Sequence, residues 1–218
     1  KPQHQVLMTR TPTVYNLHNQ INRRQYAIHY IAAEELQEKG VFSAVDLDVL
    51  RTQDKENIDR TLSDVFKKAK QNKDNTEKIM IACPSIKYAK KITKKLIQRG
   101  RKVSLSTSEN DLNSTEISNF KAGATDTLVV VGRGILGFND PSITMMLDFR
   151  CSKDLDVNFQ LFSRILRKHP KNVRKTYYRV ADKDYNNQVL ILYKISALMN
   201  KEIFMRYNRR NLDFDFAA

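Results

Sequence analysis

Short apolar runs alternate with helical patterns from residue 78 to residue 181, and this alternation limits the possible folds more than any other feature of the sequence. The apolar runs predict five strands, at residues 78–83, 102–106, 127–131, 143–149 and 176–181. The apolar spacing between them predicts helices over residues 85–99, 114–121 and 158–168. Strands that alternate with helices form a parallel sheet with helices on both faces. We therefore predict an α/β fold.

Helical patterns also flank this alternating region. Two of them precede it, at residues 23–39 and 55–71, and a polar stretch that reads QNKDNTEK follows the second. A third helical pattern, over residues 185–207, follows the last strand. We therefore divide the chain into three parts: a helical connector within residues 1–75, the α/β domain at 76–182, and a C-terminal helical extension at 183–218.

The positive charge of the chain is concentrated in two windows. The 218 residues have a formal net charge of +14, and the sequence pI is about 9.8. Residues 78–108 contain nine basic and no acidic residues, and residues 157–181 contain seven basic and no acidic residues. A basic face that serves only solubility usually mixes both signs of charge. The windows therefore favour contact with phosphate groups, in nucleic acid or at an acidic membrane, over a merely solvated surface.

The composition disfavours several other classes of protein. No apolar run approaches the roughly 18 residues that a membrane-spanning helix needs, so we expect no membrane segment. Cys83 and Cys151 both lie in apolar segments, which favours a reducing, intracellular setting over a disulfide framework. The four histidines are scattered, and we expect no metal site built from protein side chains. The first residues lack both an initiator Met and a signal-peptide core, so we expect the sequence to begin within a longer protein or after processing.

Residues 132–137 read Gly-Arg-Gly-Ile-Leu-Gly and formally satisfy the dinucleotide-binding pattern G-x-G-x-x-G. That pattern requires a following helix, whose N-terminus binds the pyrophosphate. Here Pro141 interrupts the chain and the next strand begins near Ile143, which leaves no room for a crossover helix. The stretch also differs from a P-loop, because Phe138 stands where lysine is required. We interpret it as a glycine-rich loop at the carboxyl edge of a strand, where α/β sheets bind ligands.

Four segments, in fixed order, resemble the C-terminal RecA-like domain of superfamily 2 helicases. They are KIMIACPSIKYAKKITKKL, similar to motif IV; STEISNFKAGATDTLVVVG, with its Phe-Lys-x-Gly turn; the glycine loop to Pro141 with ITMMLDF behind it, similar to motif V; and QLFSRILR, similar to motif VI. Motif VI, Q-x-x-G-R-x-x-R, is the most specific, and Ser163 replaces its glycine. The resemblance covers residues 77–182 and is closest to phage branch-migrating repair helicases and restriction-enzyme translocases.

The spacing of motif VI supports an anion-binding role independently of the resemblance. On a helix, Gln160, Arg164 and Arg167 are separated by four and three residues and would share one face. Two guanidinium groups and an amide that project together form a clamp suited to phosphate oxygens. The alternative is a basic surface helix with incidental spacing, which the order of the other three segments disfavours.

The resemblance implies that these residues contribute one side of an ATP site. Arg164 and Arg167 would be catalytic and would reach the β- and γ-phosphates, with Gln160 supporting them. In phosphoryl transfer such arginines stabilise the charge of the transferring group. Gly137 and Asn139 would line the same cleft near the nucleotide. ATP and Mg²⁺ would be held mainly by an N-terminal RecA-like domain of the same polypeptide, because these 218 residues contain neither the P-loop motif nor the acidic pair that binds Mg²⁺.

The resemblance also implies a nucleic-acid track formed by Ser85, Lys87, Gly132 and Arg133. A helix N-terminus and a glycine loop can both donate backbone N–H groups to phosphate. Two plainer interpretations remain open, since Ser85 is well placed to cap its helix and Lys87 to solvate an outer face. Asp148 is assigned no chemistry, because a position at the end of its strand is a sufficient role for it.

The function implied by the resemblance is the second RecA-like lobe of an ATP-dependent helicase or translocase acting in DNA repair or restriction, with DNA as the preferred partner. We expect this lobe to be inactive alone and cytoplasmic, in a host cell if it is encoded by a phage. Residues 1–75 would then include the end of the preceding domain. Two alternatives remain: a non-catalytic helicase-like module that binds nucleic acid or protein, and an unrelated α/β enzyme whose glycine loop binds a phosphorylated ligand.

Overall fold

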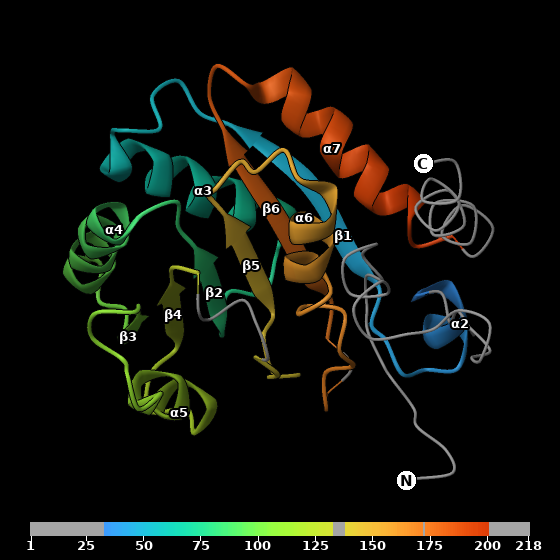
Figure 1. Cartoon of the computed structure of the whole chain (residues 1–218), viewed down its shortest axis with the longest axis horizontal. Helices are drawn as coiled ribbons and strands as arrows, with labels where there is room; N and C mark the ends of the chain where they lie inside the picture. Colours follow the sequence, from blue (N-terminus) through green and yellow to red (C-terminus); the bar gives the residue numbers. More distant parts are fainter. Residues whose placement is uncertain (1–32, 133–137, 172, 201–218) are drawn as a thin grey trace, which may run out of the picture.

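Six parallel strands form one continuous sheet in the computed structural model, which describes residues 33–132, 138–171 and 173–200 (Figure 1). The strands are β1 (Val45–Arg51), β2 (Ile79–Ala82), β3 (Val103–Ser106), β4 (Thr127–Val130), β5 (Met145–Asp148) and β6 (Lys175–Ala181). Their order across the sheet is β1-β6-β5-β2-β4-β3, and every pair is parallel. The predicted α/β class is confirmed.

Helices pack on both faces of this sheet (Figure 1). The helices are α2 (Ala33–Glu38), α3 (Ile58–Asn72), α4 (Ile86–Gln98), α5 (Thr115–Lys121), α6 (Leu155–Phe162) and α7 (Tyr185–Ala197). Buried side chains of α3 and α4 share one core with one face of the sheet. Buried side chains of α5, α6 and α7 share a second core with the other face. The arrangement is the RecA-like one that the resemblance predicted.

The central strands were predictable because they are covered on both faces. Every residue of β2, β4 and β5 is buried. Strands buried in this way consist of nearly continuous apolar residues and are therefore easily seen in the sequence. The connection between β4 and β5 crosses the edge of β2, which lies between them. The described part of that connection, residues 131–132 and 138–144, contains no helix, as expected.

The predicted domain boundary at residue 76 requires correction. β1, which the sequence did not predict, pairs with β6 along its whole length, from Val45 opposite Lys175 to Arg51 opposite Ala181. α3 buries Leu62 and Val65 in the same core as β2 and α4. Sheet and core therefore extend back to residue 45, within the stretch predicted to contain the end of a preceding domain and a helical connector.

The two flanking helical patterns lie partly outside the described residues. Of the helix expected over residues 23–39, the structure describes only the part from residue 33, where α2 ends at Glu38. Of the C-terminal helix expected over residues 185–207, α7 accounts for Tyr185–Ala197, and residues 201–207 are not among those described. The helix expected at 55–71 corresponds to α3, which Asn57 caps by accepting a hydrogen bond from the Arg60 amide.

Candidate functional site

The segment that carries Gln160, Arg164 and Arg167 is only partly helical, so the expected shared helix face is wrong. Asp154 caps α6 by accepting a hydrogen bond from the Val157 amide, and the helix therefore begins earlier than predicted and ends at Phe162. The amides of Arg164 and Ile165 bond to carbonyls three residues back, which closes a turn instead of continuing the helix. Gln160 lies on α6, Arg164 lies in this turn, and Arg167 forms an isolated antiparallel bridge with Phe42.

Arg164 points inward and contacts the end of the glycine-rich loop. Its side chain is only 9% exposed, and its Nη1 donates a hydrogen bond of 3.0 Å to the Phe138 carbonyl. Its Nε is buried and has no hydrogen-bond partner among the described residues. Burial lowers the pKa of Arg164, and the positive charge of Arg167 lowers it further. The guanidinium group of Arg164 is therefore a buried cation with unused donor capacity beside a second cation.

Arg167 is half-buried, and its backbone is held from two sides. The Ser43 hydroxyl donates to the Arg167 carbonyl at 3.4 Å, and the Ser43 amide donates to the neighbouring Leu166 carbonyl at 2.7 Å. The Lys175 ammonium donates to the same Arg167 carbonyl at 2.6 Å. The residues around Arg167 thus lie between the 41–43 segment and the start of β6, which fixes the position of the backbone.

The structure brings the motif VI segment together with the loop that follows β4. Asn139 is exposed and follows Phe138, the residue whose carbonyl Arg164 contacts. Gly137, the other residue expected near a nucleotide, lies outside the described residues. Among the described residues, no carboxylate forms an ion pair with Arg164 or Arg167. This arrangement is chemically suited to an anion with several acceptor oxygens.

Ser85 and Gly132, expected in a nucleic-acid track, lie at neighbouring carboxyl ends of the sheet. β2 and β4 are paired, and the Cys83 amide donates to the Val130 carbonyl at 2.9 Å just before these residues. Gly132 has φ +64°, a conformation that favours glycine, and both residues are exposed. The Ser85 hydroxyl accepts a hydrogen bond from the Tyr88 amide, so the plain capping role is present. Lys87 is exposed on the first turn of α4, and Arg133 is not among the described residues.

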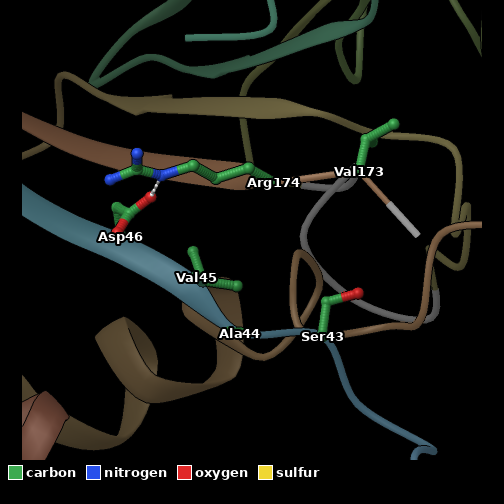
Figure 2. Close-up of a pocket in the computed structure, with 6 residues that line it drawn as sticks. All are labelled: Ser43, Ala44, Val45, Asp46, Val173 and Arg174. Atoms are coloured by element: carbon green, nitrogen blue, oxygen red, sulfur yellow. Dashed lines mark hydrogen bonds and ion pairs between the residues drawn. The ribbon is translucent and has the colours of Figure 1, made fainter. Parts of the chain in front are cut away.

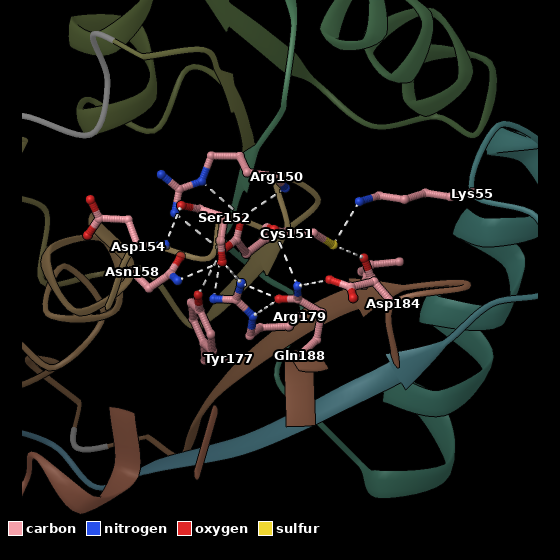
Figure 3. Close-up of polar contacts among 12 residues, drawn as sticks. Lys55, Arg150, Cys151, Ser152, Asp154, Asn158, Tyr177, Arg179, Asp184 and Gln188 are labelled. Atoms are coloured by element: carbon pink, nitrogen blue, oxygen red, sulfur yellow. Dashed lines mark hydrogen bonds and ion pairs between the residues drawn. The ribbon is translucent and has the colours of Figure 1, made fainter. Parts of the chain in front are cut away.

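A buried ionic cluster that was not predicted from the sequence surrounds Asp148, and its members Arg150, Tyr177 and Arg179 are labelled in Figure 3. Asp148 is fully buried at the end of β5 and accepts hydrogen bonds from Arg150 Nε at 3.0 Å and Arg150 Nη2 at 3.2 Å. Tyr177 donates to its Oδ2 at 3.0 Å, and Arg179 Nη1 lies 3.3 Å from the same oxygen. Burial alone would raise the pKa of this carboxyl group, but the two arginines hold its pKa below the usual value. Asp148 is therefore a charged residue inside the domain.

The same cluster ties the start of α6 to β6 and α7 (Figure 3). Arg179 Nη2 donates to the Ser152 carbonyl at 3.0 Å, and Asn158 of α6 donates to that carbonyl at 2.9 Å. Gln188 of α7 accepts from Arg179 Nε at 3.0 Å. The signal available in the sequence was a charged residue in each of two apolar strands, Asp148 and Arg179, since buried charges in strands are nearly always paired.

A shallow cavity of about 400 Å³ opens elsewhere, at the amino ends of β1 and β6 (Figure 2). Asp46 and Arg174 form an ion pair at its wall. The full lining consists of Ser43, Ala44, Val45, Asp46, Val173 and Arg174. None of the residues expected to bind nucleotide or nucleic acid lines this cavity, so its position gives no support to those assignments.

The fold matches solved structures of helicase C-terminal domains. Saccharomyces cerevisiae Dbp5 bound to RNA and ADP BeF3 is 12% identical, with a TM-score of 0.60 over 91% of this chain and 51% of that one. The Dbp5 C-terminal domain bound to Gle1 and IP6 is 14% identical, with a TM-score of 0.54 over 78% of this chain and 99% of that one. The Escherichia coli DEAD-box protein SrmB, bound to RraA, is 13% identical, with a TM-score of 0.51 over 66% and 82%.

The chain spans only part of the longer helicases that it matches. It covers 27% of the Pyrococcus furiosus Hef helicase domain, with 61% of this chain aligned at 16% identity and a TM-score of 0.45. No protein-family model matches the sequence, and no curated protein matches it. Across the described residues, no helix is both long enough and apolar enough to cross a bilayer. The fold is therefore the RecA-like fold that is also found in the C-terminal domains of these helicases.

Proposed function

We propose that this chain is the second RecA-like lobe of an ATP-dependent helicase or translocase that acts on nucleic acid. Its fold is found in the C-terminal domains of helicases. Its motif VI segment lies against the loop after β4, as a split ATP site requires. The first lobe, which would hold most of ATP and Mg²⁺, is assigned to a part of the parent protein outside these 218 residues.

The observation that carries this proposal is the pair of neighbouring cations formed by Arg164 and Arg167. Arg164 has a buried Nε without a partner, and the charge of Arg167 lowers its pKa. A buried donor that lacks a partner costs free energy, as does the proximity of two like charges. The phosphate groups of a nucleotide would relieve both costs, because they supply acceptor oxygens and negative charge.

The two arginines take different roles in this proposal. Arg167 is the more exposed and is free to stabilise negative charge on the transferring phosphoryl group. Arg164 holds the loop after β4 through the Phe138 carbonyl and offers its remaining donors to the nucleotide. Gln160 supports them from α6, and Gly137 and Asn139 border the nucleotide.

The nucleic-acid track is assigned to the carboxyl ends of β2 and β4. Ser85, Lys87 and Gly132 border this edge, and Arg133 follows in the sequence. Backbone N–H groups at a helix N-terminus and a glycine loop bind phosphate without reading sequence. The resemblance to repair and restriction enzymes favours DNA as the partner, whereas one structural neighbour is bound to RNA.

The test of this proposal is ATP hydrolysis by the full-length parent, measured with and without single-stranded DNA, duplex DNA and RNA. We expect turnover that nucleic acid stimulates, and no turnover by the 218-residue chain alone. Nucleic-acid binding by a parent that does not hydrolyse ATP would contradict the motor and favour a non-catalytic binding module. The nucleic acid that stimulates most identifies the preferred partner.

A further inference from the structure

Three residues on one face of β6 contact the segment from Ser152 to Arg167, which includes motif VI. Lys175, Tyr177 and Arg179 alternate along the strand, and alternate residues of a strand point to the same face. Tyr177 belongs to the core that contains α6, whereas Tyr178 belongs to the core on the opposite face. All three side chains are buried beneath the segment that runs from Ser152 to Arg167.

The three contacts are distributed along that segment in sequence order. Arg179 donates to the Ser152 carbonyl, just before α6 begins. The Tyr177 ring packs edge-on against Phe162, the last residue of α6, with the centroids 5.4 Å apart. Lys175 donates to the Arg167 carbonyl at 2.6 Å, beyond the turn. β6 therefore contacts the chain just before α6, at the end of α6, and at Arg167 beyond the turn.

Lys175 also joins this segment to the loop that leads into β5. Its ammonium group donates to the Pro141 carbonyl at 2.8 Å as well as to the Arg167 carbonyl. It is fully buried, and an apolar side chain of similar length would fill the same space without the cost of burying a charge. Because Lys175 donates to carbonyls in two separate segments, it can fix the loop at Pro141 relative to the segment at Arg167.

We propose that Lys175 is a positioning residue for Arg167, which holds the Arg167 backbone at a fixed distance from the loop after β4. This inference rests on the proposed function, in which Arg167 stabilises the transferring phosphoryl group. Small displacements of a catalytic group cost large factors in rate, so fixing the backbone of a catalytic arginine has a direct value. Among the described residues, the ammonium group of Lys175 donates only to backbone carbonyls, and it acts through Arg167.

The charged groups around Lys175 give the position a characteristic pH dependence. Asp140 faces it from the loop before β5, Lys78 at the start of β2 pairs with Asp140 at 2.9 Å, and His169 lies in the segment after α6. Burial lowers the pKa of Lys175 to about 8, although Asp140 acts to raise it. Because this pKa is lower in the folded chain than in water, opening of the segment takes up a proton above about pH 8 and becomes less favourable as the pH rises.

The first test measures amide hydrogen exchange in the 218-residue chain and needs no enzymatic activity. Lys175→Met keeps the length of the side chain and removes its donors, and Lys171→Met in the same connection is the exposed control. We expect the amides of Ser43 and Lys168, which bond across this segment, to exchange ~10-fold faster in Lys175→Met only. Unchanged exchange would overturn the proposal. Equal acceleration at Tyr177 and Val180 would mean general loss of the fold and would also contradict it.

A second measurement uses the wild-type chain and remains decisive if Lys175→Met does not fold. After correction for intrinsic exchange rates, the protection of the Ser43 and Lys168 amides should rise as the pH rises above about 8, because opening of this segment returns Lys175 to water, where it keeps the proton that the closed state has lost. The amides of β2, distant from Lys175, provide the internal reference. Protection that stays constant from pH 7 to pH 9 would contradict the assigned role.

The third measurement connects the position to turnover by the full-length parent. Lys175→Met should lower kcat by ~10- to 100-fold and leave the KM for ATP nearly unchanged, because it displaces Arg167 without removing it. A fall in affinity with kcat preserved would oppose a positioning role. If Arg167→Ala also leaves turnover intact, the proposed function fails, whereas the exchange experiments still decide whether Lys175 fixes this backbone.

Discussion

Arg164 and Asp148 show two opposite ways of burying a charge in one domain. Asp148 is surrounded by Arg150, Arg179 and Tyr177, all within 3.3 Å of its carboxylate. Arg164 has one carbonyl partner and a like charge nearby. A buried charge that is paired with an opposite charge stabilises one arrangement of the fold. A buried charge without such a partner indicates a place where a ligand supplies the partner.

Substitution of Asp148 tests the first of these interpretations. Asp148→Asn keeps the shape of the side chain but leaves Arg150 and Arg179 as buried cations without a counter-charge. We expect the free energy of unfolding to fall by about 3–5 kcal/mol, as is typical when one partner of a buried ion pair is removed. Urea denaturation measures this, with Asp64→Asn on α3 as a control at a partly exposed position. Equal midpoints for the two variants would show that the cluster adds no stability.

The lowered pKa of Asp148 also predicts how the free energy of unfolding changes at low pH. Its pKa in the folded chain lies below the ordinary value of 3.8, so the folded state holds the ionised form more strongly than the unfolded state does. The stabilisation is fully present above pH 4 and is lost as the pH falls through the lowered pKa. Denaturation midpoints measured between pH 2 and pH 6 should fall more steeply for the wild type than for Asp148→Asn. Parallel curves would contradict the assignment.

At the scale of elements, the sequence predicted the strands that are continuous apolar runs and missed β1, in which acidic residues interrupt the apolar ones. The apolar runs of β2, β4 and β5 were unmistakable. β1 lies at the edge of the sheet and reads VDLDVLR, an alternating pattern whose partner, β6, lies more than a hundred residues away. The distant pairing cannot be read from the local sequence, and Asp46 and Asp48 interrupt the apolar residues, so no strand was predicted there.

The end of α6 was mispredicted for a different physical reason. Ile165 and Leu166 are fully buried and continue the apolar spacing of the helix, which suggested a helix up to residue 168. They are buried because the chain passes between the 41–43 segment and β6, where the Ser43 amide bonds to the Leu166 carbonyl. The apolar residues therefore reflect burial, and the helical conformation predicted for them is wrong.

The corrected boundary leads to a prediction about truncated chains. Removal of residues 1–75 deletes β1 and α3 and exposes apolar surface of β6 and of the core that contains Leu62. Removal of residues 1–32 leaves every described element in place. We expect cooperative urea unfolding for the chain that starts at residue 33 and its loss for the chain that starts at residue 76. Equal stability of the two chains would restore the original boundary.

At the scale of the whole molecule, the proposed track makes nucleic-acid binding electrostatic. Lys87→Ala should weaken the binding of the 218-residue chain to single-stranded DNA and RNA, and should reduce the slope of log K against log salt by about one. Lys67→Ala, an exposed lysine of α3 outside the proposed track, is the matched control. Fluorescence anisotropy across a salt series measures both slopes. Equal slopes for the two variants would remove Lys87 from the track.

In the proposed assembly of two lobes, this chain would supply arginines to a site that it does not complete. The pair formed by Arg164 and Arg167, the loop after β4 and the strand β6 behave as one unit, since Lys175 and Arg164 bond to carbonyls in the same stretch, Phe138–Pro141. In an ATP-driven motor, this unit would stabilise the negative charge of the transition state of hydrolysis more than it stabilises bound ATP.

The most direct measurement is therefore nucleic-acid-stimulated ATP turnover by the full-length parent carrying Arg167→Ala. Arg60→Ala, an exposed arginine on α3, is the matched control. We predict that Arg167→Ala lowers kcat by ~10³-fold or more, as removal of an arginine finger does, while nucleotide binding changes much less and Arg60→Ala has no effect. Equal turnover by Arg167→Ala and Arg60→Ala would contradict the central claim that this segment completes an ATP site.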